Sequence, residues 1–337
     1  MRGRARRAGA TRTAATGDRA LRGRAGVARG RTARLVATLA LAPALAFVGA
    51  CSASGDTEQS SGPTRAVTHA MGTTQVPERP QRVVVLDTPE LDAAVTLGVT
   101  PVGTVRDEAS AGPSAYLGEK AANIPVVGII GTPNLEEISR LRPDLILSSK
   151  DRDEPRYQQL SQIAPTVFGE APGANWKQNF LLYSDALGKA AEGRAALDAY
   201  QNRAKQVGQQ VGDPASKTVS VVRFLTDETR LYTPGSFSGI ILADVGVARP
   251  AIVQNAEDIA VNISPEELPK ADADFVYAAY YAPKEMTTFP QGQALWAQLG
   301  AVREGRAFDV DDKIWMTGIG VTGANLVLDD LQRTLKA

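Results

Sequence analysis

Two stretches of the sequence share one pattern, Asn134–Leu147 (NLEEISRLRPDLIL) and Ser264–Tyr277 (SPEELPKADADFVY). Each begins with a helix-capping residue and two nearby glutamates, carries a basic residue six positions after the cap, and ends in a hydrophobic run preceded by aspartate. The stretches align without a gap at an offset of 130 residues. A helix that leads into a buried strand therefore occurs twice, which predicts two copies of one α/β unit.

Each stretch follows a strand and a helix of its own. In the first half, the run RVVVL (Arg82–Leu86) predicts a buried strand, and Glu90–Gly98 predicts a helix that ends on glycine. In the second half, VSVVRF (Val219–Phe224) and Ser238–Gly246 predict the same pair. The repeated order predicts the fold class: α/β, with two Rossmann-like lobes, mostly parallel sheets and a ligand cleft between the lobes.

The segment between the two halves predicts one long linking helix over residues 175–212. It contains no proline between Trp176 and Val211, and apolar residues recur near the helical period at Phe180, Leu181, Tyr183, Ala186, Leu187, Ala190, Leu197 and Tyr200. A helix of about 30 residues spans roughly 45 Å, enough to join two lobes. We expect an N-terminal lobe over 66–174 and a C-terminal lobe over 217–337. Gly188 and Gly193 are expected to weaken or bend the helix locally.

Residues 1–50 have the pattern of a signal peptide with a long basic N-terminal extension. They hold 11 of the 37 basic residues and one acidic residue, and they end in an uncharged apolar run, Leu35–Val48, that is too short for a typical membrane span. The run leads into Gly49-Ala50-Cys51, which resembles a bacterial lipobox, where the cysteine receives a diacylglycerol. We therefore expect Cys51 to be lipidated, residues 51–65 to be a flexible tether, and the protein to be anchored on the extracytoplasmic face of the cell membrane.

The composition of the remaining chain excludes several function classes. After Ala50 there are 26 basic and 36 acidic residues, a net charge of about −10, which argues against nucleic-acid binding. The single cysteine and single histidine exclude an intrachain disulfide, a thiolate metal cluster and a His-rich zinc site. We predict no cofactor, and no metal site on the protein itself.

No pattern of the chain supports catalysis. Gly318–Gly323 fits G-x-G-x-x-G, but it follows no first strand, and the chain ends 14 residues later, before the acidic partner of a dinucleotide site. The segment PGSFSG (Pro234–Gly239) is not a nucleophile elbow, and the only histidine, His69, lies on the predicted extended start of the N-terminal lobe. Chance, or a tight helix entry near Trp315, is the better account of the Gly318–Gly323 match, and we predict that the protein is not an enzyme.

Candidate ligand-binding residues follow from the topology, because ligands of parallel α/β units bind beyond the carboxyl ends of the strands. Guanidinium groups bind the oxygens of carboxylates, catecholates or hydroxamates, and aromatic rings cover apolar ligand arms. The candidates of both kinds are Arg106, Arg152, Arg223, Tyr232, Tyr280, Tyr281 and Trp315. Core packing of the aromatic residues, and an interlobe ion pair for Arg223, remain open alternatives.

Several segments resemble bacterial ABC-importer binding proteins for ferric siderophores, whose two lobes are joined by one long helix. The resemblance covers nearly all of residues 66–335. The segments that carry it are THAMGTTQVPERPQRVVVLD, NLEEISRLRPDLIL, LSQIAPTV, the linking helix, RLYTPGSFSGIILADVGVARP, ISPEEL and IWMTGIGVTGANLVLDDL. It implies a monomeric binding protein that captures an Fe(III)-siderophore complex, with the iron held by the siderophore, and delivers it to an ABC permease and its ATPase.

The resemblance leaves the ligand open. The siderophore class is undetermined, although hydroxamate binders can carry an arginine where this chain has Ile129-Ile130-Gly131. A cobalamin or haem binder of the same fold is an alternative. A cell-surface enzyme or adhesion module is an alternative from another class.

The paired glutamates suggest a second function for the repeated stretches. Glu137 and Glu267 fall at the third helical position, where each can complete a capping box with its cap residue. Glu136 and Glu266 are not needed for capping, although the helix dipole favours an acid there. In the family that the chain resembles, the matching acids, one per lobe, dock on arginines of the permease. The resemblance therefore implies docking for Glu136 and Glu266.

Overall fold

The computed structural model describes residues 62–335. The predicted signal peptide, Cys51 and residues 51–61 of the predicted tether lie outside the described residues. Across 62–335, no helix combines the length and the apolar character needed to cross a membrane.

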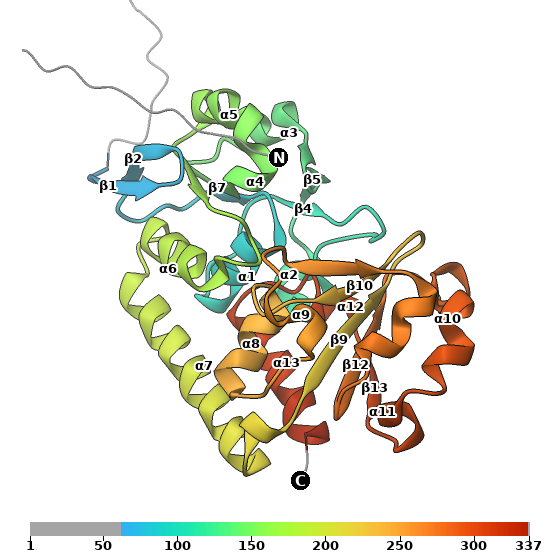
Figure 1. Cartoon of the computed structure of the whole chain (residues 1–337). Helices are drawn as coiled ribbons and strands as arrows, with labels where there is room; N and C mark the ends of the chain where they lie inside the picture. The colour runs from blue at the N-terminus through green and yellow to red at the C-terminus, as the bar shows by residue number, and fades with distance from the viewer. Residues whose placement is uncertain (1–61, 336–337) are drawn as a thin grey trace, which may run out of the picture. The chain divides into compact units, whose positions relative to one another are not determined.

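The first lobe is built from short strands that alternate with helices (Figure 1). Its elements are β1 (Thr64–His69), β2 (Gly72–Pro77), β3 (Val83–Val85), α1 (Thr88–Thr96), β4 (Thr104–Arg106), α2 (Glu119–Ala122), β5 (Val126–Ile129), β6 (Thr132–Pro133), α3 (Leu135–Arg140), β7 (Leu145–Ser149), α4 (Lys150–Asp153), α5 (Tyr157–Ile163) and β8 (Thr166–Gly169). Strands β3, β7 and β8 pair in parallel, with β7 in the centre. A single bridge from Val84 to Gly103 connects them to β4, β5 and β6. Every residue of β3 and β7 is buried, as expected for parallel strands covered on both faces.

The second lobe contains one five-stranded sheet in the order β11-β10-β9-β12-β13. Its elements are β9 (Val219–Phe224), β10 (Thr229–Tyr232), α8 (Phe237–Val245), α9 (Ala251–Gln254), β11 (Ala260–Ile263), β12 (Phe275–Tyr280), α10 (Phe289–Trp296), α11 (Gly300–Arg303), β13 (Ala307–Val310), α12 (Asp312–Trp315) and α13 (Val321–Thr334). Strands β9, β12 and β13 are parallel, whereas β10 and β11 are antiparallel neighbours on one side. The carboxyl ends of the three parallel strands therefore lie at the same edge of this sheet.

The repeat in the sequence has the same structural role in both lobes. Asp144 accepts hydrogen bonds from the backbone N–H groups of Gln81 and Arg82, directly before β3. Asp274 accepts the N–H of Thr218, directly before β9. Each aspartate thus joins the start of its own strand to the start of the neighbouring parallel strand, which fixes the register of the pair.

The two copies differ in their helices. The first is α3, whereas Pro265–Ala271 forms a 3₁₀ helix with Pro269 inside it. The predicted capping box is present between Ser264 and Glu267. The predicted capping box of the first lobe is absent. The side chain of Asn134 accepts the N–H groups of Glu136 and Glu137, but the side chain of Glu137 pairs with Arg140 and does not return to the cap.

The predicted single linking helix is wrong in one respect, because the segment forms two helices, α6 (Trp176–Ala186) and α7 (Ala190–Val211). Gly188 between them has φ +71°, and a Cβ there would lie 2.4 Å from the carbonyl oxygen of Glu78. A left-handed residue ends the first helix, as is common at helix C-termini. At 22 residues, α7 spans about 33 Å and packs against α8 and α13.

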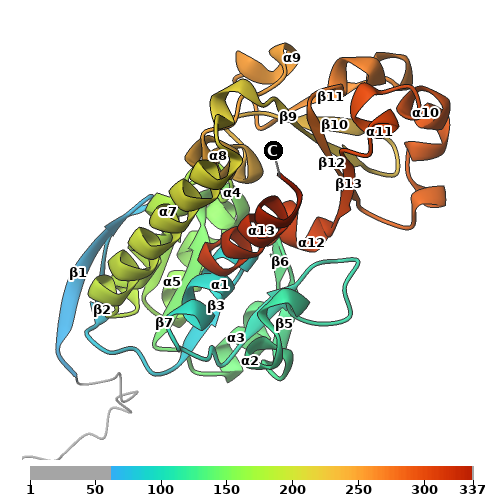
Figure 2. The same ribbon diagram turned by 90° about the horizontal axis from the view of Figure 1, so that it is seen from below.

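The glycine-rich segment leads into α13, so of the two accounts left open for its pattern the helix entry applies (Figure 2). The carboxylate of Asp92, on α1, accepts the backbone N–H groups of Thr322 and Gly323, each at 3.1 Å. Gly320 has φ +156°, and a Cβ there would lie 2.2 Å from Cγ of Asp92. The fully buried carboxylate thus occupies the helix N-terminus that a bound phosphate would use in a dinucleotide site. Burial raises the pKa of Asp92 to about 6.

Candidate ligand-binding site

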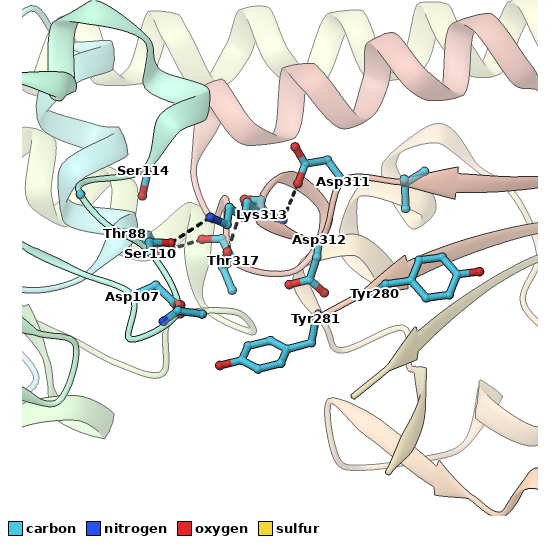
Figure 3. A pocket seen from close by; sticks show the side chains of 13 residues that line it. Thr88, Asp107, Ser110, Ser114, Tyr280, Tyr281, Asp311, Asp312, Lys313 and Thr317 are labelled. Carbon is cyan, nitrogen blue, oxygen red and sulfur yellow. Dashed lines mark hydrogen bonds between the residues drawn. The ribbon is translucent and has the colours of Figure 1, made fainter. Parts of the chain in front are cut away.

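A cavity of about 240 Å³ lies where loops after the first-lobe strands meet the ends of β12 and β13 (Figure 3). We call this cavity the cleft. The residues that line it are Thr88, Asp107, Ala109, Ser110, Gly112, Ser114, Tyr280, Tyr281, Val310, Asp311, Asp312, Lys313 and Thr317. They follow β3, β4, β12 and β13, so the cleft lies at the carboxyl ends of strands from both lobes.

Two of the predicted ligand residues, Tyr280 and Tyr281, line the cleft. The ring of Tyr280 stacks on Phe224 at 5.4 Å between centroids, and its hydroxyl donates to Asp309. The side chain of Tyr281 remains 37% exposed. Packing thus fixes the first ring, whereas the ring of Tyr281 is partly open to solvent.

Arg223 lies behind this aromatic face, at the end of β9. Its Nε and Nη2 both donate to the carboxylate of Asp312 at 2.6 Å, and its Nη1 donates to the hydroxyl of Tyr232 at 3.3 Å. The guanidinium carbon is 5.5 Å from the ring centroid of Tyr281. The ion pair that was an alternative for Arg223 is present, but both partners belong to the second lobe, so the pair is not interlobe.

The other two predicted arginines, Arg106 and Arg152, form hydrogen bonds within the first lobe and are not among the residues that line the cleft. Arg106 donates from one nitrogen to the carbonyl oxygens of Asp107, Glu108 and Ser110, which shapes the loop that lines the cleft. Arg152 donates from Nε to the buried carboxylate of Asp87 at 2.8 Å.

The remaining predicted aromatic residues lie in the core. Tyr232 is 7% exposed, and its hydroxyl accepts from Arg223. Trp315 is fully buried, stacks on Tyr277 at 4.6 Å, and donates from Nε1 to Asp330. Neither residue lines the cleft, and the contacts of Trp315 are those of a packing residue.

Hydrogen bonds cross the cleft between residues that the sequence did not single out. Nζ of Lys313 donates to Oγ of Ser110 at 2.9 Å, and Oγ1 of Thr88 donates to the carbonyl oxygen of Thr317 at 2.7 Å (Figure 3). Three lining residues that sequence reasoning did not assign to the cleft, Asp311–Lys313, directly follow β13. The sequence of β13, AFDV, contains a charged residue and does not have the pattern of a buried strand. Recognising Ala307–Val310 as a strand would have pointed to Asp311–Lys313 by the same topological rule.

A buried carboxyl group, Glu90, lies on α1 in the first lobe. It accepts a hydrogen bond from the hydroxyl of Tyr183, and its Oε2 has no hydrogen-bond partner among residues 62–335. Burial, and secondly the charge of Asp87, raises the pKa of Glu90 to about 8. The folded protein therefore holds a proton there at pH values where the unfolded chain has lost it.

This proton makes the stability dependent on pH. Because the folded pKa of Glu90 lies above its ordinary value, its contribution to stability is present at low pH and is lost as the pH rises toward about 8. We expect Glu90→Gln, which stays neutral and keeps an acceptor for Tyr183, to lose less stability than the wild type between about pH 5 and 9. Urea unfolding of both proteins across this pH range measures how the free energy of unfolding of each depends on pH. Parallel stability curves for the two proteins would contradict the assignment.

Glu136 and Glu266 have equivalent places in the two lobes. Both are exposed at the second position of their helix. Glu136 forms an ion pair with Arg140 one turn later. In the second lobe, Lys270 pairs with Glu267 instead, through Oε1 at 2.6 Å. The two carboxylates therefore lie on the surface of separate lobes.

Comparisons with known proteins show which family the chain is similar to. A family model described as periplasmic binding protein matches residues 83–314. The chain is 39% identical over 305 residues to the "Probable siderophore-binding lipoprotein YfiY" of Bacillus subtilis, over 86% of this chain and 94% of that protein. It is 31% identical to the achromobactin-binding periplasmic protein of Dickeya dadantii, over 75% and 86% of the two chains. Staphylococcus aureus SirA complexed with staphyloferrin B superposes with a TM-score of 0.73 at 32% identity, over 81% of this chain and 98% of that chain.

Proposed function

We propose that this chain, which belongs to the periplasmic binding protein family, captures a ferric siderophore in its cleft and delivers it to an ABC permease and its ATPase. The observation that carries the proposal is the cleft itself. It lies at the carboxyl ends of strands from both lobes, and its lining combines aromatic rings with hydroxyl and charged groups. The names of relatives from three organisms refer to siderophores or siderophore complexes, which supports this ligand class.

Binding of a bulky chelate requires the cleft to open. Ligand sites typically enclose about 300–1,000 Å³, more than the roughly 240 Å³ of this cleft. The cross-cleft hydrogen bonds of Lys313 and Thr88 are among the contacts between the lobes that opening of the cleft would break. We assign the first ligand contacts to Tyr281, Tyr280 and Lys313, with Arg223 directly behind them.

The test of this function is the ligand that the protein retains. Protein purified from iron-starved native cells should release a ferric chelate that mass spectrometry identifies, and the loaded protein should show the visible absorption of an iron chelate. A corrinoid or porphyrin spectrum would replace the siderophore by cobalamin or haem. Catalytic turnover without a retained ligand would favour a cell-surface enzyme.

We propose that the protein acts as a monomer and is not an enzyme.

The proposed location is the extracytoplasmic face of the cell membrane, through a lipid on Cys51. Cys51→Ala removes the only thiol of the chain, so the variant should appear in the culture medium with its fold and ligand affinity intact. Fractionation followed by immunoblotting measures its distribution. Retention of the variant in the membrane fraction at wild-type levels would overturn the lipid anchor.

We also propose that Glu136 and Glu266 are the permease contacts. Their equivalent placement, one exposed carboxylate on each lobe, supports this role. A permease that binds both can sense the separation of the lobes and hence whether a ligand is present.

A further inference from the structure

The three arginines near the cleft already donate hydrogen bonds to acceptor groups of this chain. Arg223 uses two donors on Asp312, with side chains only 10% and 11% exposed. Arg152 pairs with Asp87, and Arg106 is occupied by three backbone carbonyl oxygens. A guanidinium paired with a carboxylate, as in Arg223 and Arg152, contributes little net attraction to an incoming anion. Arg106 keeps its charge, because its carbonyl partners are neutral, but one of its nitrogens is held in the loop.

The cleft lining itself is not cationic. Its charged residues, among those that the structure describes, are Asp107, Asp311, Asp312 and Lys313. Asp312 is offset by Arg223, and the single positive charge of Lys313 is outnumbered by the carboxylates of Asp107 and Asp311. Lys313 forms its hydrogen bond with a neutral hydroxyl, Oγ of Ser110. An anion in the cleft would therefore meet no excess of positive charge.

The consequence for a ferric chelate depends on its ligand groups. Three singly charged hydroxamates balance Fe(III), whereas three doubly charged catecholates leave a trianion. A trianion loses its hydration on entry and faces carboxylates, which opposes binding. An uncharged chelate avoids both penalties and keeps the aromatic contacts of Tyr280 and Tyr281.

We propose that the cleft selects ferric chelates of low net charge, and that Asp312 determines this selectivity by neutralising Arg223. The proposal rests on the proposed siderophore function and specifies the ligand charge. Asp312 is a specificity-determining residue in this scheme, since it lines the cleft and controls whether the guanidinium behind it acts as a free cation.

The experiment compares two probes, the uncharged ferric complex of a cyclic trihydroxamate and the trianionic ferric complex of a tricatechol. Fluorescence titration of the full-length protein gives both affinities, at low and at physiological ionic strength because salt screens charge effects. The variants are Asp312→Asn, the charge-balanced double variant Arg223→Gln/Asp312→Asn, and Asp198→Asn. Asp198 is an exposed residue of α7 outside the cleft and controls for net charge.

We expect the wild type and Asp198→Asn to bind the uncharged chelate at least about tenfold more tightly than the trianion. Asp312→Asn should reduce that ratio by about tenfold, because the freed guanidinium attracts the trianion. The double variant should return to the wild-type ratio, even if its absolute affinity is lower. It also provides the comparison if the single variant folds poorly.

The outcomes separate this inference from the proposed function. Tighter binding of the trianion by the wild type, or an unchanged ratio in Asp312→Asn, overturns the selectivity while the siderophore function stands. Failure of the wild type to bind the uncharged chelate overturns the selectivity, whereas the siderophore function is overturned only if the native protein releases no ferric chelate.

Discussion

Substituting Glu136 and Glu266 together by alanine should leave ligand affinity nearly unchanged and sharply reduce uptake of the ferric siderophore into cells. Neither carboxylate lines the cleft, and neither accepts a capping hydrogen bond in its helix. The permease would lose one charged contact on each lobe, so only the transfer step would be affected. Uptake of a radiolabelled ferric chelate, with fluorescence titration of the purified variant, measures both quantities.

The matched control is the double variant Glu137→Ala/Glu267→Ala, which removes the same number of charges from the adjacent positions. Glu267 completes the capping box of its helix and Glu137 pairs with Arg140, so this control should lose some stability. Transport by its folded fraction should remain close to the wild-type level. Equal transport by the two double variants at equal surface abundance would show that Glu136 and Glu266 are not the docking residues.

Arg223→Ala should both destabilise the second lobe and weaken ligand binding. The substitution leaves the carboxylate of Asp312 largely buried without its partner, and breaking a buried ion pair in this way costs about 3–5 kcal/mol. Affinity for a ferric chelate should fall at least about tenfold, because the support behind Tyr281 is lost together with the charge balance of the cleft.

Urea unfolding and fluorescence titration measure these two effects. The double variant Arg223→Ala/Asp312→Ala should recover much of the lost stability, since no unpaired charge stays buried. If Arg223→Ala unfolded at the wild-type urea concentration, the ion pair would contribute no net stability. If it also bound the chelate as tightly as the wild type, Arg223 would have no role in the cleft.

Local patterns were sufficient to predict the α/β fold class and the family, and both predictions are confirmed. The repeat could be recognised because a capping residue, two acids and a buried strand are all properties of neighbouring residues. Ile138 and Leu268, at equivalent positions of the two copies, are both buried. Tyr280 and Tyr281 could be predicted for the cleft because the run FVYAAY clearly marks where β12 ends.

Other predictions failed where the deciding contact lies far away in the sequence. The sequence indicated Gly188 as a weak point of the linking helix but not that the helix ends there, where the backbone of Glu78 lies close by. For Trp315 the sequence left ligand contact and core packing both open, and its ring lies against Tyr277 in the core. Asp311–Lys313 was missed because AFDV is a strand only through its pairing with β12.

The sequence by itself determined the two related α/β units, the strand and helix that begin each of them, and the capping at Ser264. These features depend on hydrogen bonding and periodicity over a few residues. Only the tertiary structure decided which charges of the cleft are free. Arg223 and Asp312 are 89 positions apart, and parallel pairing of β9, β12 and β13 brings them together at one sheet edge. Electrostatic pairing depends on distance through space, which the separation of two residues along the chain does not specify.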